Sequence, residues 1–135
     1  MLAVAAALLV ATGTVLLLTS GDGGQPASDG AQPQLLAPAE FAAEVAAPGV
    51  VTVNVHVPDE GSIRGTDLAI PYDRITAMRA KLPPPSTPLA IYCRSGRMSA
   101  IAARTLAGLG YEQVSELAGG MDAWEASGRA LLPPA

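Results

Sequence analysis

The chain has 135 residues, which is room for one domain and a short extension. Half of the residues are hydrophobic but only 4% are aromatic, so a core must be built mainly from Ala, Val, Leu and Ile. The net charge of -4 argues against a nucleic-acid-binding surface, which needs clustered Lys and Arg. A single cysteine excludes an internal disulfide, and one cysteine with one histidine cannot form a structural zinc site.

The N-terminal part of the chain divides into an apolar run and a polar tether. Residues 1–20 are almost wholly apolar and have no polar face, which is typical of a membrane anchor or signal segment. No Lys or Arg precedes the run, although signal segments and inside-oriented anchors normally carry positive charge there. No clear Ala-x-Ala cleavage site follows the run, and an uncleaved anchor is favoured over a cleaved signal. Residues 21–34 are rich in Gly, Ser, Asp, Gln and Pro, which predicts a flexible linker. We therefore expect an extracytoplasmic protein, in the periplasm or cell envelope, that is anchored in the membrane or exported.

Residues 35–135 predict a domain of alternating helices and strands. The strand at 50–55 is β-branched and almost continuously apolar, as expected of a strand covered on both faces. The other predicted strands are 67–70, 89–92 and 111–117, and the predicted helices are 38–45, 74–82, 99–109 and 121–127. Alternation in this order indicates a parallel α/β sheet with right-handed crossovers.

The only cysteine, Cys93, directly follows the predicted strand 89–92. Ligands of parallel sheets bind at the carboxyl ends of strands, and the following helix N-terminus favours negative charge there. Such a position favours the thiolate, which is the reactive form of cysteine. The alternative interpretation is a core cysteine that ends a buried strand. The glycine, two serines and two arginines in residues 94–99 favour a reactive thiol.

Two segments of the chain resemble the single-domain rhodaneses, a family of sulfurtransferases. Residues 92–99, Tyr-Cys-Arg-Ser-Gly-Arg-Met-Ser, resemble the active-site loop of that family. Residues 119–124, Gly-Gly-Met-Asp-Ala-Trp, resemble its Gly-Gly-x-x-x-Trp segment before the last helix. The resemblance covers about residues 35–132 and implies a three-layer α/β domain with a central parallel sheet flanked by helices.

The resemblance also implies a reaction and a site. Cys93 would accept a sulfane sulfur from a small anionic, thiosulfate-like donor and pass it from a persulfide to a thiol or cyanide, with no metal or other cofactor. The amides of the loop could form an anion nest, and its two arginines would attract the donor, although either could be a solvated surface charge. Its two serines could donate to the sulfur or cap the helix. The expected substrate-binding residues are the six that follow the cysteine: Arg94, Ser95, Gly96, Arg97, Met98 and Ser99.

The sequence departs from the family pattern at three places: the loop, the end of the second strand, and residues 61–66, which replace a His-Ile-Pro-Gly-Ala type segment. The second arginine of the family loop usually stands five positions after the cysteine, where this chain has Met98, with Arg97 one position earlier. The second strand usually ends in Asp-x-Arg, but here it ends in Asn54-Val55-His56, so an internal ion pair is missing. A Cys–His couple with His56 is conceivable, but a local structural substitution is favoured.

Three other functions stay open beside the sulfurtransferase. A rhodanese-like module could bind a partner or carry persulfide sulfur with little turnover of its own. A cysteine phosphatase needs Arg at the sixth position after Cys93, where this chain has Ser99, and would lack its guanidinium for phosphate. A thiol redox protein is disfavoured because there is no second cysteine to resolve a disulfide. The sequence does not indicate an oligomeric state.

Overall fold

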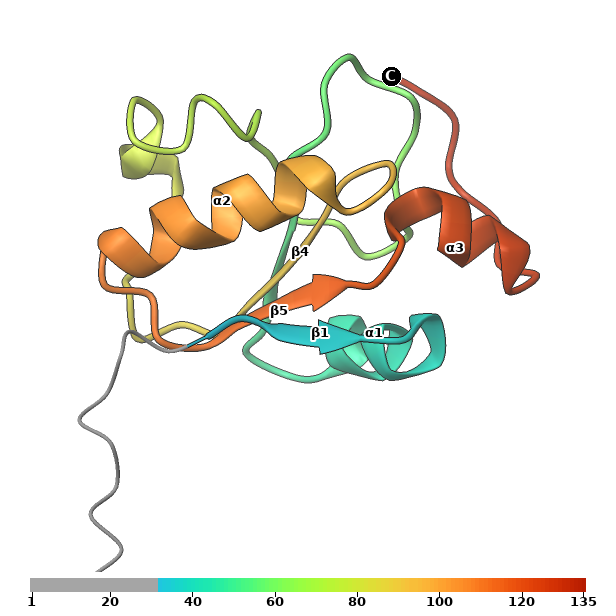
Figure 1. Cartoon of the computed structure of the whole chain (residues 1–135), viewed down its shortest axis with the longest axis horizontal. Coiled ribbons are helices and arrows are strands. Elements are labelled where there is room, and N and C mark those ends of the chain that lie inside the picture. The colour runs from blue at the N-terminus through green and yellow to red at the C-terminus, as the bar shows by residue number, and fades with distance from the viewer. Residues whose placement is uncertain (1–31) are drawn as a thin grey trace, which may run out of the picture.

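The computed structural model describes residues 32–135, so the predicted anchor (1–20) and residues 21–31 of the linker lie outside the described residues. Five parallel strands form one sheet in the order β1-β5-β4-β2-β3, which confirms the predicted α/β fold (Figure 1). The strands are β1 (Gln34–Leu36), β2 (Val51–Asn54), β3 (Leu68–Ala69), β4 (Leu89–Tyr92) and β5 (Val114–Leu117). The helices are α1 (Pro38–Ala46), α2 (Arg97–Gly108) and α3 (Gly120–Ala126), with a short 3-10 turn, η1, at Arg79–Lys81.

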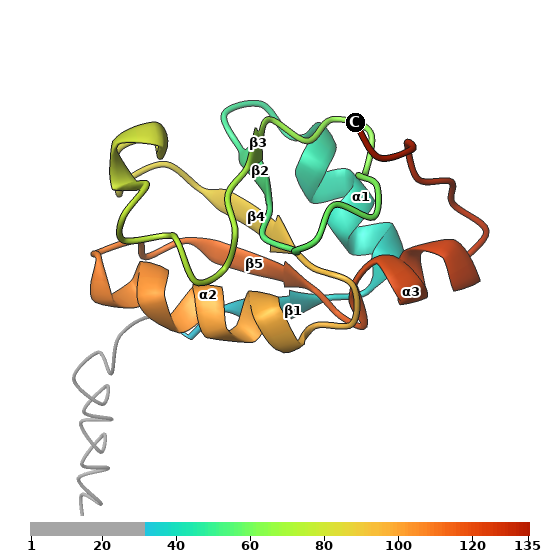
Figure 2. The same ribbon diagram turned by 90° about the horizontal axis from the view of Figure 1, so that it is seen from above.

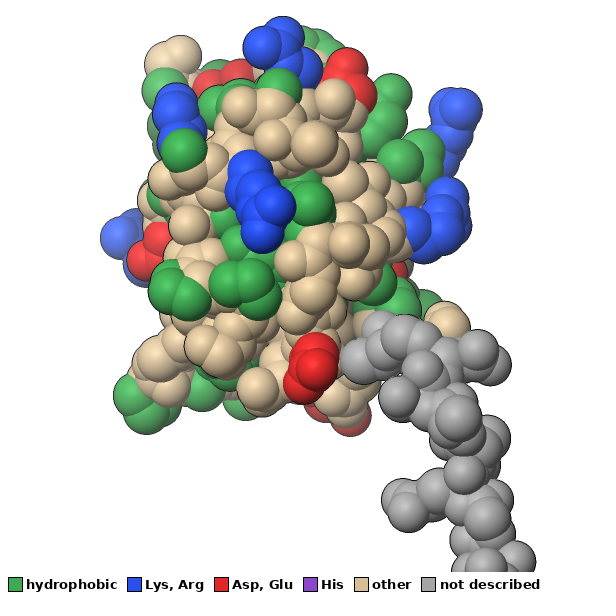
Figure 3. Space-filling view, turned by 90° about the vertical axis from the view of Figure 1, so that its left-hand side faces the viewer, with side chains coloured by type: hydrophobic (Ala, Val, Ile, Leu, Met, Phe, Trp, Pro, Cys, Tyr) green, Lys and Arg blue, Asp and Glu red, His purple; other side chains and the backbone are tan. Residues whose placement is uncertain are grey.

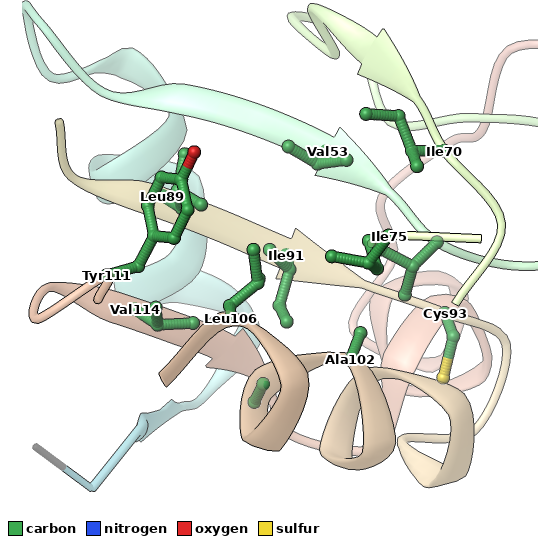
Figure 4. Packing of buried hydrophobic residues seen from close by; sticks show 12 residues of the cluster. Val53, Ile70, Ile75, Leu89, Ile91, Cys93, Ala102, Leu106, Tyr111 and Val114 are labelled. Carbon is green, nitrogen blue, oxygen red and sulfur yellow. The ribbon is translucent and has the colours of Figure 1, made fainter. Parts of the chain in front are cut away.

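Helices cover both faces of the sheet, with α2 on one face and α1 and α3 on the other (Figure 2). The central strand β4 is buried at all four residues, because side chains of a strand alternate between its two faces. Ile91 and Cys93 pack in the core layer under α2, whereas Ala90 and Tyr92 pack in the layer under α1 and α3. Figure 4 shows the layer under α2, in which the sulfur of Cys93 points toward the start of that helix.

The predicted strands and most predicted helices are present with ends shifted by a few residues, but the helix predicted at 74–82 is wrong. That segment forms turns and the 3-10 turn η1. Ile75 is its only fully buried residue, and Pro71 and Pro83 lie close to its two ends. A helix this short is marginal unless a continuous face is buried, and here one is not.

Strand β1 is an element that the sequence did not predict. It has only three residues, and two of them are exposed, so it has no alternating apolar pattern. It forms because it pairs in parallel with β5, in the register Leu35 to Glu116. It begins at Gln34, one residue before the predicted start of the domain.

Two features of the described surface are relevant to partners. Within residues 32–135 no helix is long and apolar enough to cross a bilayer. At the end of the molecule where α2 finishes, away from the Cys93 loop, basic side chains are scattered among acidic and apolar ones (Figure 3). That face therefore presents no continuous basic surface among the described residues.

Candidate active site

Cys93 lies directly after β4 and is fully buried, with 0% of its surface exposed. Its Sγ accepts a hydrogen bond from the backbone N–H of Gly96 at 3.0 Å. Gly96 has a φ of +103°, a left-handed conformation that L side chains rarely adopt, and it is the N-cap of α2. This turn directs the backbone amide of Gly96 at the sulfur.

Ser99 lies in the first turn of α2 and is fully buried. Its Oγ is 3.7 Å from Sγ of Cys93 and donates a hydrogen bond to the carbonyl oxygen of Gly96 at 3.1 Å. It is therefore not the N-cap residue of the helix. Ser99 does contact the sulfur, but as the acceptor of a hydrogen bond from Cys93 Sγ and not as the predicted donor.

The start of α3 is hydrogen-bonded to the backbone of the Cys93 loop. The backbone N–H of Met121 donates to the carbonyl oxygen of Cys93 at 2.9 Å, and that of Asp122 donates to the carbonyl oxygen of Arg94 at 3.0 Å. Gly120 has a φ of +61°, and a Cβ there would overlap both carbonyl oxygens. The Gly-Gly-x-x-x-Trp segment thus carries no reacting group but fixes the backbone on which Cys93 sits.

The other predicted site residues lie around the loop with different degrees of exposure. The guanidinium of Arg94 pairs with Asp122, at 2.9 Å between Nε and Oδ1, and its second nitrogen lies 3.9 Å from Glu125. Arg97 is exposed and has no ion-pair partner among residues 32–135. Ser95 is exposed, and half-buried Met98 packs against the core layer that contains Cys93. Arg97 is therefore the loop arginine whose side chain is free to meet an anion, whereas the guanidinium of Arg94 is paired with acidic side chains of α3.

The end of β2 is organised without the ion pair that the family pattern would supply. Asn54 donates to the carbonyl oxygen of Gly61 at 3.1 Å and accepts the backbone N–H of His56 at 3.0 Å. The Nε2 atom of His56 pairs with Glu60 four residues later. A cavity of about 440 Å³ lies beside these residues at the ends of β2 and β3, and Cys93 is not among its lining residues. These contacts support the interpretation of His56 as a local structural residue.

Two buried polar residues on β4 and β5 were not predicted to be site residues. The hydroxyl of Tyr92 accepts the backbone N–H of Ile63 at 2.9 Å and lies 2.8 Å from the Thr66 hydroxyl, and burial raises the pKa of Tyr92. Glu116 on β5 is only 5% exposed. Both lie in short strands whose residues are all buried, and such burial is not visible in a four-residue pattern.

The model of the rhodanese-like domain family matches residues 37–127. The chain belongs to this family. The family, recognised from residues 92–99 and 119–124, is thus confirmed, and the structure adds that its single cysteine is buried. No curated protein matches the chain.

Solved structures of rhodanese-like proteins share the fold. A rhodanese-related protein from Thermoplasma volcanium is 22% identical, with a TM-score of 0.61 over 73% of this chain and 97% of its own. The Alr3790 protein from Anabaena sp. is 22% identical, with a TM-score of 0.64 over 73% of this chain and 92% of the solved chain. A protein of unknown function from Rhodopseudomonas palustris, described as a possible tyrosine phosphatase, is 24% identical, with a TM-score of 0.61 over 73% of this chain and 84% of its own. At these identities the likeness shows the fold alone.

Proposed function

We propose that this rhodanese-like domain is a sulfurtransferase that moves a sulfane sulfur from an anionic, thiosulfate-like donor through Cys93 to a thiol or cyanide. The observation that carries the proposal is the 3.0 Å hydrogen bond from the Gly96 N–H to Sγ. Hydrogen bonds to a charged acceptor are stronger than those to a neutral one, so this amide is placed to stabilise negative charge on Sγ when the sulfur attacks a donor and when it leaves the persulfide.

The reaction needs no group beyond the thiolate and the two substrates. The Cys93 thiolate attacks the outer sulfur of thiosulfate, a sulfur–sulfur bond to Cys93 forms, and the bond within the donor breaks so that sulfite leaves with its electron pair. The acceptor then attacks the terminal sulfur of the persulfide. Cyanide leaves as thiocyanate, a thiolate leaves as a persulfide, and in either case the Cys93 thiolate is restored. Exposed Arg97 would attract the donor anion.

The full burial of Cys93 favours a second candidate function. A donor can reach an enclosed sulfur only when the loop of residues 94–98 opens. A domain whose loop opens only against a protein partner would act as a binding or sulfur-carrier module, with little turnover of small donors.

The experiment that separates these functions is the intact mass of the protein after brief incubation with thiosulfate and removal of the excess. The sulfurtransferase gains the mass of one sulfur atom, and cyanide removes it. Cys93→Ser should stay folded and gain nothing, and a variant that still transferred sulfur would exclude Cys93 as the nucleophile. No gain in the native protein, with a thiol that still reacts with an alkylating agent, would favour the binding or carrier module.

We also propose that the domain is held outside the cytoplasmic membrane by residues 1–20. The support is the apolar, charge-free sequence of that segment and the polar segment that follows it. Protein that stays with membranes through an alkaline wash would agree with an anchor, whereas protein recovered in the cytoplasmic fraction would overturn the proposal.

A further inference from the structure

The cavity of about 440 Å³ at the carboxyl ends of β2 and β3 is not used by the proposed reaction. Its volume is in the range of small-molecule sites, and ligands of α/β proteins bind at this end of a parallel sheet. One part of its wall is β3 and the residues around it, from Asp67 to Pro71. Another part is the end of the chain, Pro133 and Ala135, which lies beside the loop after β2 (Figures 1 and 2). The fold thus brings together segments that are far apart in the sequence.

Hydrogen bonds hold these segments in place around the cavity. The backbone groups of Ser62 and Leu132 exchange two hydrogen bonds, at 3.0 and 2.7 Å. The carboxyl of Asp59 accepts the backbone N–H of Gly61 and that of Ala135, each at 3.0 Å. Because the wall is already fixed by these bonds, a ligand would bind there with little further ordering of the chain.

The charged groups of the wall match a positively charged ligand. The carboxyls of Asp59 and Asp67 line the cavity, and neither forms an ion pair among residues 32–135. No Lys or Arg is among the described residues that line it. The backbone N–H groups of Gly61 and Ala135 lower the pKa of Asp59, so this carboxyl is charged at neutral pH. One oxygen of Asp67 accepts the backbone N–H of Thr52 at 2.8 Å, and its other oxygen has no hydrogen bond in the described part of the chain.

The wall also contains a buried nitrogen that lacks a partner. His56 lines the cavity, and only 7% of its side chain is exposed. Its Nε2 pairs with Glu60, whereas its Nδ1 has no hydrogen-bond partner among the described residues. An unpaired buried polar atom costs free energy. Nδ1 is enclosed as the ring stands, so a ligand N–H would reach it after a turn of the ring toward the cavity.

An organic cation matches the cavity better than a metal ion does. Within residues 32–135 no three His, Cys, Asp or Glu side chains are grouped so that they could hold a metal. Much of the remaining wall is apolar, including Leu68, Ala69, Ile70 and Pro133. A ligand that satisfies both kinds of wall carries an ammonium group on a hydrocarbon body.

We propose that this cavity is a second binding site, which takes a small organic ammonium ion. The charged end of the ligand meets Asp67 and Asp59, and its hydrocarbon part packs against the apolar residues of β3. The site is separate from the candidate active site, because neither Cys93 nor any residue of its loop lines the cavity.

The test is a titration of the full chain with three molecules of similar shape, benzylammonium, benzyl alcohol and benzoate, followed through the backbone amide signals in NMR spectra. We expect benzylammonium to shift the signals of the lining residues until they saturate. Benzyl alcohol should bind about tenfold more weakly, because it lacks the charge-assisted contact, and benzoate should not bind. Equal binding of the ammonium ion and the alcohol, or no saturable shift with benzylammonium, would overturn the proposal.

Two matched variants locate the charge that the ligand meets. Asp67→Asn keeps an oxygen for the Thr52 N–H but removes the charge, and it should weaken benzylammonium binding about tenfold. Asp73→Asn removes the same charge from an exposed residue that does not line the cavity, and it should bind as the native protein does. Equal losses in the two variants would mean that the ligand responds only to the net charge of the protein, which would overturn the proposal.

A third variant fills the cavity and leaves its charges unchanged. Ala69 is exposed and lines the cavity, so Ala69→Leu should block all binding even if Asp67→Asn does not fold. Undiminished binding in folded Ala69→Leu protein would exclude this cavity as the site.

This inference goes beyond the proposed function and does not depend on it. The titration contains no sulfur donor, so binding is measured whether or not Cys93 carries sulfur. Thiosulfate, the anion expected at the Cys93 loop, should not displace benzylammonium. Displacement would place the ligand at the candidate active site and refute a separate one.

Discussion

Arg94 and Arg97 flank the same thiol but differ in what they contact. Arg94 is paired with Asp122, whereas Arg97 is exposed and has no ion-pair partner among the described residues. Their sequence positions suggested the same role for both, attraction of an anionic donor. The ion pair of Arg94 with α3 could not be predicted, because it depends on where a segment almost thirty residues later folds back.

This difference predicts unequal effects of two matched substitutions. Arg97→Ala should raise the apparent KM for thiosulfate on the order of tenfold, because a charge-assisted contact with the donor is worth about 1.5–3 kcal/mol. Arg94→Ala should change KM little and lower the free energy of unfolding by at most about 1 kcal/mol, as expected of an exposed ion pair. Steady-state kinetics and urea unfolding of both variants measure this. Equal effects on KM would mean that Arg94 leaves Asp122 to meet the donor.

Some single residues could be placed from the sequence and others could not. Cys93 and Gly96 could be placed correctly because a strand, a turn and a helix N-terminus follow from local pattern. Glu116 could not, because a glutamate in a strand normally indicates its solvent face. Its burial results from the approach of α2 and β1 on either side, which is tertiary information.

At the scale of elements, the backbone contacts between the Cys93 loop and the start of α3 hold the site together. Gly120 allows this approach, since a Cβ there would overlap the carbonyl oxygens of Cys93 and Arg94. Gly128, just after α3, has a similar positive φ but has nothing within 4 Å of the position of a Cβ. A comparison of substitutions at Gly120 and Gly128 therefore separates the effect of a collision with the loop from the cost of a left-handed backbone.

Gly128→Ala should lower the free energy of unfolding by about 1–2 kcal/mol, which is the cost of placing a side chain in the left-handed region. Gly120→Ala adds the collision, and we expect a loss on the order of 4 kcal/mol and a slower reaction of Cys93 with thiosulfate. Urea unfolding followed by circular dichroism gives both values. Similar losses in the two variants would show that the loop can retreat from α3 without cost.

The errors in element prediction also arise because tertiary packing, which local sequence patterns do not show, decides which segments form helices and strands. The segment 74–82 carries helical spacing of Ile75, Met78 and Leu82, yet only Ile75 is fully buried. The spacing of the apolar residues fits a helix, but the fold does not bury a continuous face of this segment, so a helix is not stabilised. Strand β1 shows the converse, because pairing with β5 creates a strand where the local pattern is too short to indicate one.

At the scale of the whole molecule, β1 closes one edge of the sheet. All three of its residues pair with β5, and Leu36 is buried against the layer under α1 and α3. Without β1, the edge of β5 would be open to pair with other chains. A domain boundary drawn at residue 35 would fall inside this strand.

We therefore expect a chain that begins at Gln32 to fold and a chain that begins at Pro38 to be less stable by about 2–3 kcal/mol, the value of burying one leucine side chain. The shorter chain should also associate, because it exposes a strand edge. Urea unfolding and light scattering of the two proteins at equal concentration test this. Equal stability and a monomeric shorter chain would mean that β1 is dispensable.

The parallel sheet gives the domain a direction. Because every strand runs the same way, the chain enters at one end of the sheet, at β1, and the Cys93 loop lies at the opposite end (Figure 1). A four-residue strand is about 13 Å long, so the entry point and the thiol are separated by at least that distance. Whatever surface the chain is attached to through residue 32, whether a lipid bilayer or a chromatography bead, would lie behind the domain, with the loop that covers Cys93 at the end turned toward the surrounding solution.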